Sequence, residues 1–131
     1  MALSLNPGVP HDALKTVMQA LKVELPSDYS AFLYTSNGGE GFLGENYVSL
    51  WRAEELKKWN DAYEVAQAAP GLILFGSDGG GEAYAFDTHT NPWAVVQVPF
   101  IGMGDSDSAI PLGRSFSEFL QKIGGAVTGG E

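Results

Sequence analysis

Apolar residues recur at helical spacing in the first part of the chain and in short, strand-length runs further on. Leu14, Val17, Met18 and Leu21 stand at i, i+3, i+4 and i+7, the one-sided stripe of a helix that packs on something larger. This spacing predicts a helix over 11–23. Downstream, apolar runs bounded by Gly, Asp, Asn and Pro are typical of antiparallel strands, and they predict strands over 72–75, 82–86 and 93–98.

Turn and cap signals define the remaining elements. Pro26 fits the first turn of a second helix, and Asn37-Gly38-Gly39 ends it, with Asn37 or Gly38 in the left-handed conformation. Ser115-Phe116-Ser117-Glu118 is a capping box that predicts a closing helix to about residue 123. A strand over 47–50 and a third helix over 53–68 complete the pattern. Helices before and after a run of strands indicate an α+β domain.

Chain length, composition and net charge limit the classes of protein to which this sequence can belong. A chain of 131 residues, of which 44% are hydrophobic, is long enough for one domain with one core. We expect an extension over 1–10, the domain over 11–123 and a flexible Gly-rich tail over 124–131. The net charge of −9 repels phosphate backbones and acidic lipid surfaces, so we expect neither nucleic acid nor membrane as a partner. The absence of cysteine rules out thiol chemistry and fits a reducing compartment. Because no apolar run is long enough to span a bilayer, we expect a soluble, cytoplasmic protein. Either a monomer or a homodimer is compatible with the sequence.

Two segments suggest chemistry but lack the full pattern for it. The loop over 76–82 is rich in glycine, yet it has no Lys at its end and runs into a strand, so we interpret it as a hairpin turn and not as a phosphate loop. Asp78, Glu82, Asp105 and Asp107 are the carboxylates that could gather a divalent ion or act as acid and base. Because no EF-hand spacing or nucleophile motif accompanies them, we expect no metal, no cofactor and no catalytic residue.

The placement of charge favours a binding surface. From residue 59 to residue 112 every formal charge is negative, so the sheet and its loops should be acidic unless folding brings Lys57, Lys58 or Arg114 alongside. Such a surface attracts a basic partner, although excess negative charge also serves solubility alone. The candidate binding residues are the acidic side chains and one aromatic anchor, namely Glu40, Glu45, Trp51, Asp78, Glu82, Asp105 and Asp107. We expect Trp51 to be exposed and Trp59, Trp93 and Phe100 mostly to fill the core.

An ordered series of short motifs resembles the SUKH superfamily, also called Smi/Knr-like. The resemblance covers about residues 14–123. The motifs are Leu25-Pro26-Ser27-Asp28-Tyr29 with Phe32-Leu33, Asn37-Gly38-Gly39, the segment from Phe75 to Glu82, Ala85-Phe86-Asp87, Val98-Pro99 and the segment from Ser115 to Leu120. It implies an α+β fold with a predominantly antiparallel sheet, N-terminal helices packed against it and a C-terminal helix. The motifs mark turns and helix boundaries, so the resemblance transfers no site residues.

The same resemblance implies a function. Bacterial members of the superfamily are typically small immunity proteins that bind and neutralise toxins, often nucleases, and fungal relatives regulate cell-wall synthesis through protein contacts. The expected partner is therefore a basic toxin domain. Two alternatives stay open, a regulatory module that acts on a cellular protein and, with less support, a metal-dependent enzyme that uses the loop carboxylates.

Overall fold

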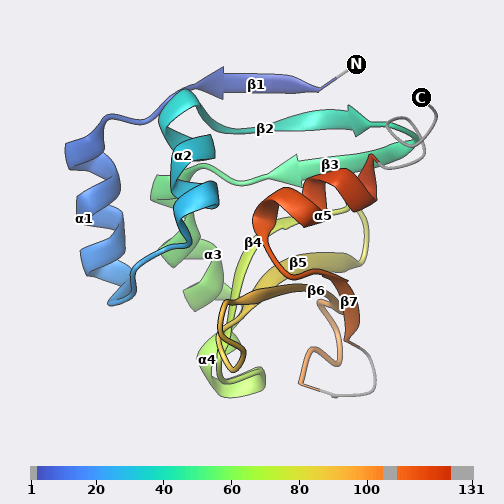
Figure 1. Cartoon of the computed structure of the whole chain (residues 1–131). Helices are drawn as coiled ribbons and strands as arrows, with labels where there is room; N and C mark the ends of the chain where they lie inside the picture. Colours follow the sequence, from blue (N-terminus) through green and yellow to red (C-terminus); the bar gives the residue numbers. More distant parts are fainter. Residues whose placement is uncertain (1–2, 105–108, 125–131) are drawn as a thin grey trace.

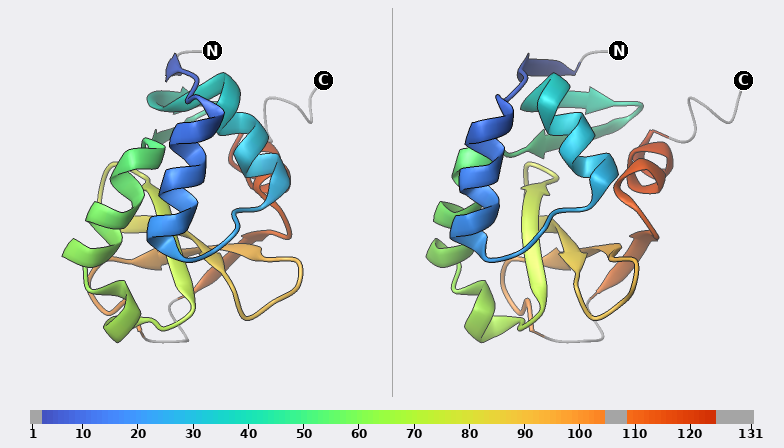
Figure 2. Two further views of the ribbon diagram at one scale, coloured as in Figure 1. Left: turned by 90° about the vertical axis from the view of Figure 1, so that its left-hand side faces the viewer. Right: turned by 60° about the vertical axis from the view of Figure 1, so that its left-hand side comes forward.

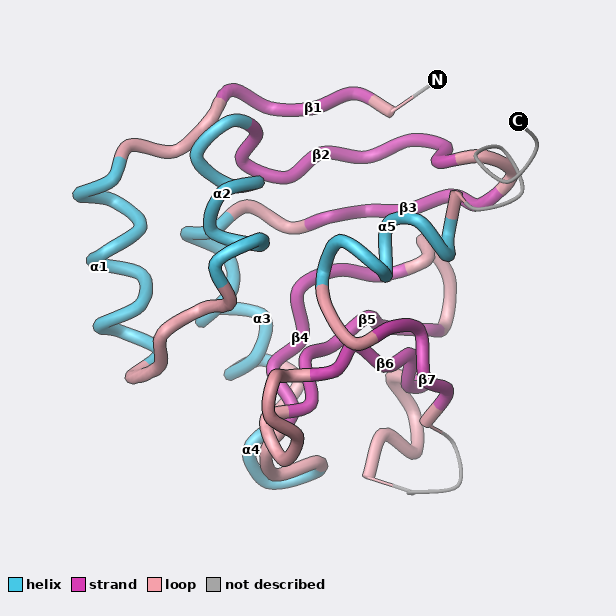
Figure 3. Tube along the Cα trace, in the orientation of Figure 1, coloured by secondary structure: helices cyan, strands magenta, loops and turns pink. Residues whose placement is uncertain are grey.

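All the strands of the computed structural model, which describes residues 3–104 and 109–124, lie side by side in chain order (Figures 1 and 3). Each strand pairs antiparallel with the next, which makes one seven-stranded sheet. The strands are β1 (Ser4–Pro7), β2 (Ser36–Leu43), β3 (Asn46–Leu50), β4 (Leu72–Ser77), β5 (Glu82–Asp87), β6 (Ala94–Pro99) and β7 (Ile110–Gly113). The expected α+β class and antiparallel sheet are confirmed.

Helices cover the sheet as the apolar patterns predict. The helices are α1 (His11–Leu21), α2 (Ser27–Thr35), the short 3₁₀ turn η1 (Ala53–Glu55), α3 (Leu56–Ala62), α4 (Val65–Ala68) and α5 (Phe116–Ile123). Figure 2 shows α1 lying between α2 and α3. The predicted N-cap is confirmed at α5, where the Ser115 hydroxyl accepts from the Glu118 amide at 3.1 Å. The Glu118 carboxylate accepts at 3.0 Å from the amide of Arg114, one residue before the N-cap, so the reciprocal half of the capping box is shifted by one residue.

Three local predictions differ from the structure. Helix α2 ends at Thr35, and Gly38, at φ 76°, is left-handed as expected but inside β2. The expected helix over 53–68 breaks at Glu64, which has φ 54°. Strand β1 lies in the segment predicted as an extension, and it forms the first strand of the sheet. Of the predicted tail over 124–131, only Gly124 lies among the described residues.

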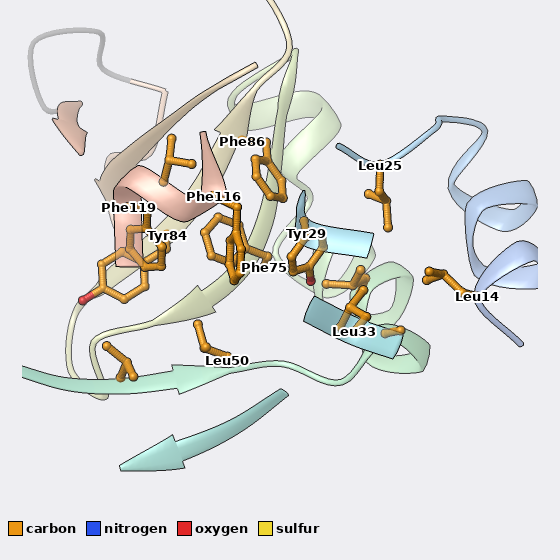
Figure 4. Packing of buried hydrophobic residues seen from close by; sticks show 14 of the residues in the cluster. Leu14, Leu25, Tyr29, Leu33, Leu50, Phe75, Tyr84, Phe86, Phe116 and Phe119 are labelled. Carbon is orange, nitrogen blue, oxygen red and sulfur yellow. The ribbon is translucent and has the colours of Figure 1, made fainter. Parts of the chain in front are cut away.

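The main core lies between one face of the sheet and α1, α2 and α5, and aromatic rings dominate it (Figure 4). Phe75 of β4 has no exposed surface, and its ring centroid lies 4.5 Å from that of Phe86 and 5.3 Å from that of Phe119. Tyr29 of α2 packs 5.6 Å from Phe75, and burial raises the pKa of its phenol above the ordinary value of 10. The motif residues Tyr29, Phe75 and Phe86 therefore serve as core.

A second apolar cluster covers the opposite face of the sheet. Ala83 and Ala85 point to it, whereas Tyr84 and Phe86 of the same strand point to the main core, because successive side chains of a strand alternate between faces. Val65 and Ala69, in and after α4, pack over this second cluster. None of the helices in residues 3–104 and 109–124 has the length and apolar character needed to cross a bilayer.

Candidate functional site

A row of polar side chains crosses the sheet face that is turned away from α2 and α5. Strand register pairs Ser4 with Glu40, Glu40 with Ser49, and Ser49 with Ser77. Directly paired residues project to the same face of a sheet. Val48 and Leu50, one residue either side of Ser49, belong to the main core, so the row lies on the other face.

Four aromatic rings form a wall beside this row. The ring centroids of Trp51 and Trp59 are 6.1 Å apart, those of Trp59 and Tyr63 are also 6.1 Å apart, and those of Tyr63 and Phe100 are 4.7 Å apart. Trp59 and Tyr63 share one side of α3 because they are four residues apart in a helix. Trp59 is half-buried and Tyr63 is exposed, so the wall keeps contact with solvent. Trp51 was expected to be exposed but is half-buried, because it packs against both apolar clusters.

The polar row and the aromatic wall border an open cleft of about 590 Å³, which we call the aromatic cleft. The residues that line it are Glu40, Tyr47, Ser49, Trp51, Glu55, Trp59, Tyr63, Ser77, Gly79, Gly80 and Phe100. Its charged lining residues are Glu40 and Glu55, both acidic. Within the described residues, no Lys, Arg or His nitrogen lies within 4.0 Å of either carboxylate.

Hydrogen bonds orient both carboxylates. The Tyr47 hydroxyl donates to Glu40 Oε2 at 2.6 Å, and the Arg52 backbone N–H donates to Glu55 Oε1 at 3.1 Å. The bond to Glu40 raises the pKa of Tyr47 above its ordinary value of 10, because ionising the phenol would remove the donor and place two negative charges together. Tyr47 therefore stays protonated and holds Glu40 across the floor of the cleft.

Asn37 attaches the segment that carries Trp51 and Glu55 to the sheet. Its side-chain Nδ2 donates to Glu54 Oε1 at 2.8 Å, and its Oδ1 accepts from the Ala53 amide at 2.8 Å. Asn37 is only 8% exposed, so these bonds satisfy a side chain that would otherwise be costly to bury. Asn37 of the Asn-Gly-Gly motif, which lies within β2, thus positions one wall of the cleft.

Asn60 attaches α3, the other wall, to β4. Strands β3 and β4 pair at only two positions, Ser49 with Ser77 and Leu50 with Gly76. Beyond these positions the backbone of Leu74 pairs with the side chain of Asn60 instead of with β3. Asn60 Nδ2 donates to the Leu74 carbonyl at 2.9 Å, and Asn60 Oδ1 accepts from the Leu74 N–H at 2.9 Å. One asparagine therefore replaces a strand neighbour and sets where Trp59 and Tyr63 lie.

The Asn37 bond predicts a pH-dependent contribution of Glu54 to stability. This bond and, less strongly, the Arg52 charge lower the pKa of Glu54 below its ordinary value of 4.5. A lowered folded-state pKa stabilises the protein above the unfolded pKa, and the contribution disappears as the pH falls through the folded pKa. At pH 7, Glu54→Gln should lower the free energy of unfolding by less than about 1 kcal/mol, because Glu54 is exposed.

Urea unfolding at pH 7 and at pH 3 tests this expectation. The difference between the wild type and Glu54→Gln should shrink at pH 3, because a larger share of the Glu54 carboxylate is protonated there than at pH 7. The matched control is Glu24→Gln, which changes an exposed carboxylate that has no hydrogen-bond partner among residues 3–104 and 109–124. A difference that stays the same at both pH values would contradict the role of the ionised Glu54.

The structure brings two of the predicted binding residues together, Glu40 and Trp51, which both line the cleft. Asp78 lies in the turn beside the lining residues Gly79 and Gly80, where its Oδ1 accepts the Gly80 and Glu82 amides at 2.8 and 3.2 Å. The hairpin interpretation of this loop is confirmed, since β4 and β5 pair across it. Asp78 also contributes, after burial, to raising the pKa of Tyr84 to about 12.

The other predicted binding residues lie elsewhere. Glu82 begins β5 and accepts a 3.4 Å bond from Gln97, while Glu45 is exposed in the turn between β2 and β3. Neither lines the cleft. Asp105 and Asp107 lie outside the described residues.

Two lysines offset part of the negative charge near α3. Lys57 pairs with Asp61 at 2.6 Å, and Lys58 Nζ lies 4.9 Å from the centre of the Trp59 ring. Folding therefore brings part of the basic charge beside the acidic segment.

The sequence interpretation missed part of the aromatic wall. Trp59 belongs to neither apolar cluster, although its helical spacing predicts a core position. The i, i+4 spacing of Trp59 and Tyr63 does show that the two rings share a face, but spacing alone does not distinguish a buried face from one that borders a cavity. No sequence pattern distinguishes Glu55 as a cleft residue from the other acidic residues of the chain. No group of three or more His, Asp or Glu side chains able to hold a metal occurs in residues 3–104 and 109–124.

Comparison with known proteins agrees with this architecture. The model of the SMI1 / KNR4 family (SUKH-1) matches residues 8–122, most of the chain. The chain belongs to the SMI1 / KNR4 family. This SUKH-1 chain is also 31% identical over 83 residues to one of the subunits of glutamyl-tRNA(Gln) amidotransferase from Oleidesulfovibrio alaskensis, and the match covers 63% of the chain. The match spans only 17% of that much longer relative.

Proposed function

We propose that this SUKH-1 protein is an immunity-type protein that binds and neutralises a basic, nuclease-like bacterial toxin domain without catalysing a reaction. The aromatic cleft carries the proposal. Half-buried Trp and Tyr rings bordered by polar groups are the features that dominate binding energy at protein interfaces. The cleft combines the half-buried rings of Trp51 and Trp59, and the rings of Tyr63 and Phe100, with two carboxylates that have no ion-pair partner among the described residues.

Charge supports the choice of a basic partner. The protein carries −9 overall, and both charged residues that line the cleft are acidic. Nuclease domains present positive charge to their substrates because they bind phosphates. An acidic protein that covers such a surface would both attract the toxin and exclude its substrate.

Co-expression tests the proposed function. The protein should restore growth when it is expressed with the toxin encoded by the neighbouring gene. Trp59→Ala, which changes a cleft residue that belongs to neither apolar cluster, should abolish this protection while leaving the fold intact. Trp93→Ala, which changes a tryptophan packed against the main core, shows whether simple loss of stability has the same effect. Absence of protection, together with a stable complex between this chain and a cellular protein, would favour a regulatory module instead.

The salt dependence of association tests the role of charge. Glu40→Lys with Glu55→Lys should slow association with the toxin about tenfold at low salt and change dissociation much less, because interfacial charges act mainly on the encounter rate. The control reverses two exposed charges elsewhere, Asp12→Lys with Glu24→Lys, and changes the net charge equally. Stopped-flow measurements from low to high salt should show the two double variants converging. Association as fast at low as at high salt would contradict steering.

A further inference from the structure

We propose that the aromatic cleft is an arginine-binding site, in which a guanidinium group of the partner stacks on the rings of the wall and pairs with Glu40 and Glu55. This inference rests on the proposed binding function and specifies the chemistry of the partner at that same site. It commits to a protein segment with an exposed arginine as the occupant.

The rings provide the stacking surface. Trp51, Trp59 and Tyr63 follow one another at centroid distances of 6.1 Å, with Trp59 and Tyr63 only 30° from parallel. A cation held within about 6 Å of an indole or phenol ring is attracted by its π electrons, and Trp attracts it best. The molecule already contains one such contact, since Lys58 Nζ lies 4.9 Å from the Trp59 ring. Lys58 itself does not line the cleft.

The carboxylates provide the pairing partners. Glu40 and Glu55 both line the cleft with the rings, and each is oriented by a hydrogen bond that uses one of its oxygens, from Tyr47 and from the Arg52 backbone respectively. A carboxylate oxygen accepts more than one hydrogen bond and each group has a second oxygen, so both can still receive donors from a ligand.

Arginine fits this combination better than lysine does. Guanidinium is planar, stacks on aromatic faces, is weakly hydrated and presents five donors in a fork that matches carboxylates, whereas ammonium is a strongly hydrated point charge. The volume of about 590 Å³ also exceeds what a single ion needs and suits a side chain with its flanking backbone.

The positions of the basic residues make the aromatic cleft the favoured site for a cation, because basic residues line two other hollows and not the cleft. A neighbouring cavity of about 380 Å³ shares Glu40, Trp51 and Glu55 with the cleft but is lined by Arg52 as well. A hollow of about 700 Å³ beside β7 and α5 is lined by one acidic residue, Glu118, and two basic residues, Arg114 and Lys122, which would repel an arginine. The aromatic cleft alone among these three joins aromatic rings to acidic groups with no basic lining residue.

Indole resonances give a direct test with the whole chain. The protein has three tryptophans, and Trp→Phe variants assign their ¹⁵N–¹H indole signals. Titration with the capped peptide acetyl-Gly-Ser-Arg-Gly-Ser-amide should shift the signals of Trp51 and Trp59, which line the cleft, but not that of Trp93, which does not. The same peptide with citrulline, the neutral analogue of arginine, should bind at least about tenfold more weakly. A lysine peptide should lie between the two.

Isosteric variants separate charge from shape. Glu40→Gln with Glu55→Gln keeps an acceptor for Tyr47 and for the Arg52 amide and takes the net charge from −9 to −7 by removing two negative charges. This variant should weaken the arginine peptide about tenfold and leave the citrulline peptide unchanged. Asp12→Asn with Glu24→Gln, which has the same net charge, should bind the arginine peptide as the wild type does.

Three results would overturn the inference. They are equal binding of the arginine and citrulline peptides, shifts of the Trp93 signal as large as those of Trp51, or no shift up to millimolar peptide. The outcome is independent of the toxin experiment. Peptide binding in the cleft without protection in co-expression would contradict only the immunity function, whereas protection that survives the Glu40→Gln and Glu55→Gln changes would contradict only arginine recognition.

Discussion

Replacing Phe75 by alanine is expected to lower the free energy of unfolding by about 3 to 5 kcal/mol, the usual cost of truncating a fully buried phenylalanine. The ring has no exposed surface, and five aromatic rings surround it, those of Tyr29, Tyr84, Phe86, Phe116 and Phe119. These rings come from α2, β5 and α5 (Figure 4), so one truncation removes contacts between all the layers of the main core. A loss of this size is a large part of the stability of an ordinary domain, about 5 to 15 kcal/mol.

Phe42→Ala is the matched control for this prediction. Phe42 is 49% exposed and packs edge-on against Tyr47 at 5.5 Å, so the same chemical change should cost about 1 kcal/mol or less. Urea unfolding followed by far-ultraviolet circular dichroism measures both variants. If Phe75→Ala cost no more than Phe42→Ala, Phe75 would not be the centre of the core.

Asn60→Ala is expected to lower the free energy of unfolding by about 2 to 4 kcal/mol and to change the aromatic cleft. The substitution removes the partners of both the N–H and the C=O of Leu74, whose side chain is fully buried. A buried backbone group without a partner costs about 1 to 3 kcal/mol. Because Asn60 also holds α3 on β4, the indole signal of Trp59 should shift and that of Trp93 should not.

Asn46→Ala is the matched control for the stability effect of Asn60→Ala. Asn46 is exposed, and its amide donates to the Ile123 carbonyl at 2.7 Å. Loss of this one solvent-accessible bond should cost about 1 kcal/mol or less. Equal effects of the two substitutions would show that Asn60 does not substitute for a strand neighbour.

Local patterns in the sequence were sufficient to predict the helices and strands that have a clear apolar periodicity. Strands β4, β5 and β6 are apolar runs ended by turn residues, and α1 and α5 have one apolar face. The elements that were missed lack such patterns. Strand β2 contains Ser36-Asn37-Gly38-Gly39 and β7 is Ile110-Pro111-Leu112-Gly113, and neither reads as an alternating strand. They are strands because their neighbours supply hydrogen bonds, which is a tertiary effect.

The break at Glu64 has a similar origin. Periodicity continues from 53 to 68, so nothing local requires an interruption. Asn60 fixes α3 on β4, while Val65 and Ala69 pack into the second apolar cluster. We infer that one straight helix would not satisfy both attachments, and the chain changes direction at a left-handed Glu64.

By itself the sequence determined the α+β class, the order of the main elements, the acidic charge and the family, because all of these depend on composition or on residues close together in the chain. Only the tertiary structure decided which acidic and aromatic residues share a site. Glu40, Ser49 and Ser77 meet through strand register, and Trp51, Trp59 and Phe100 meet through the packing of α3 beside the sheet. Register and packing join residues far apart in the chain, and no local spacing encodes them.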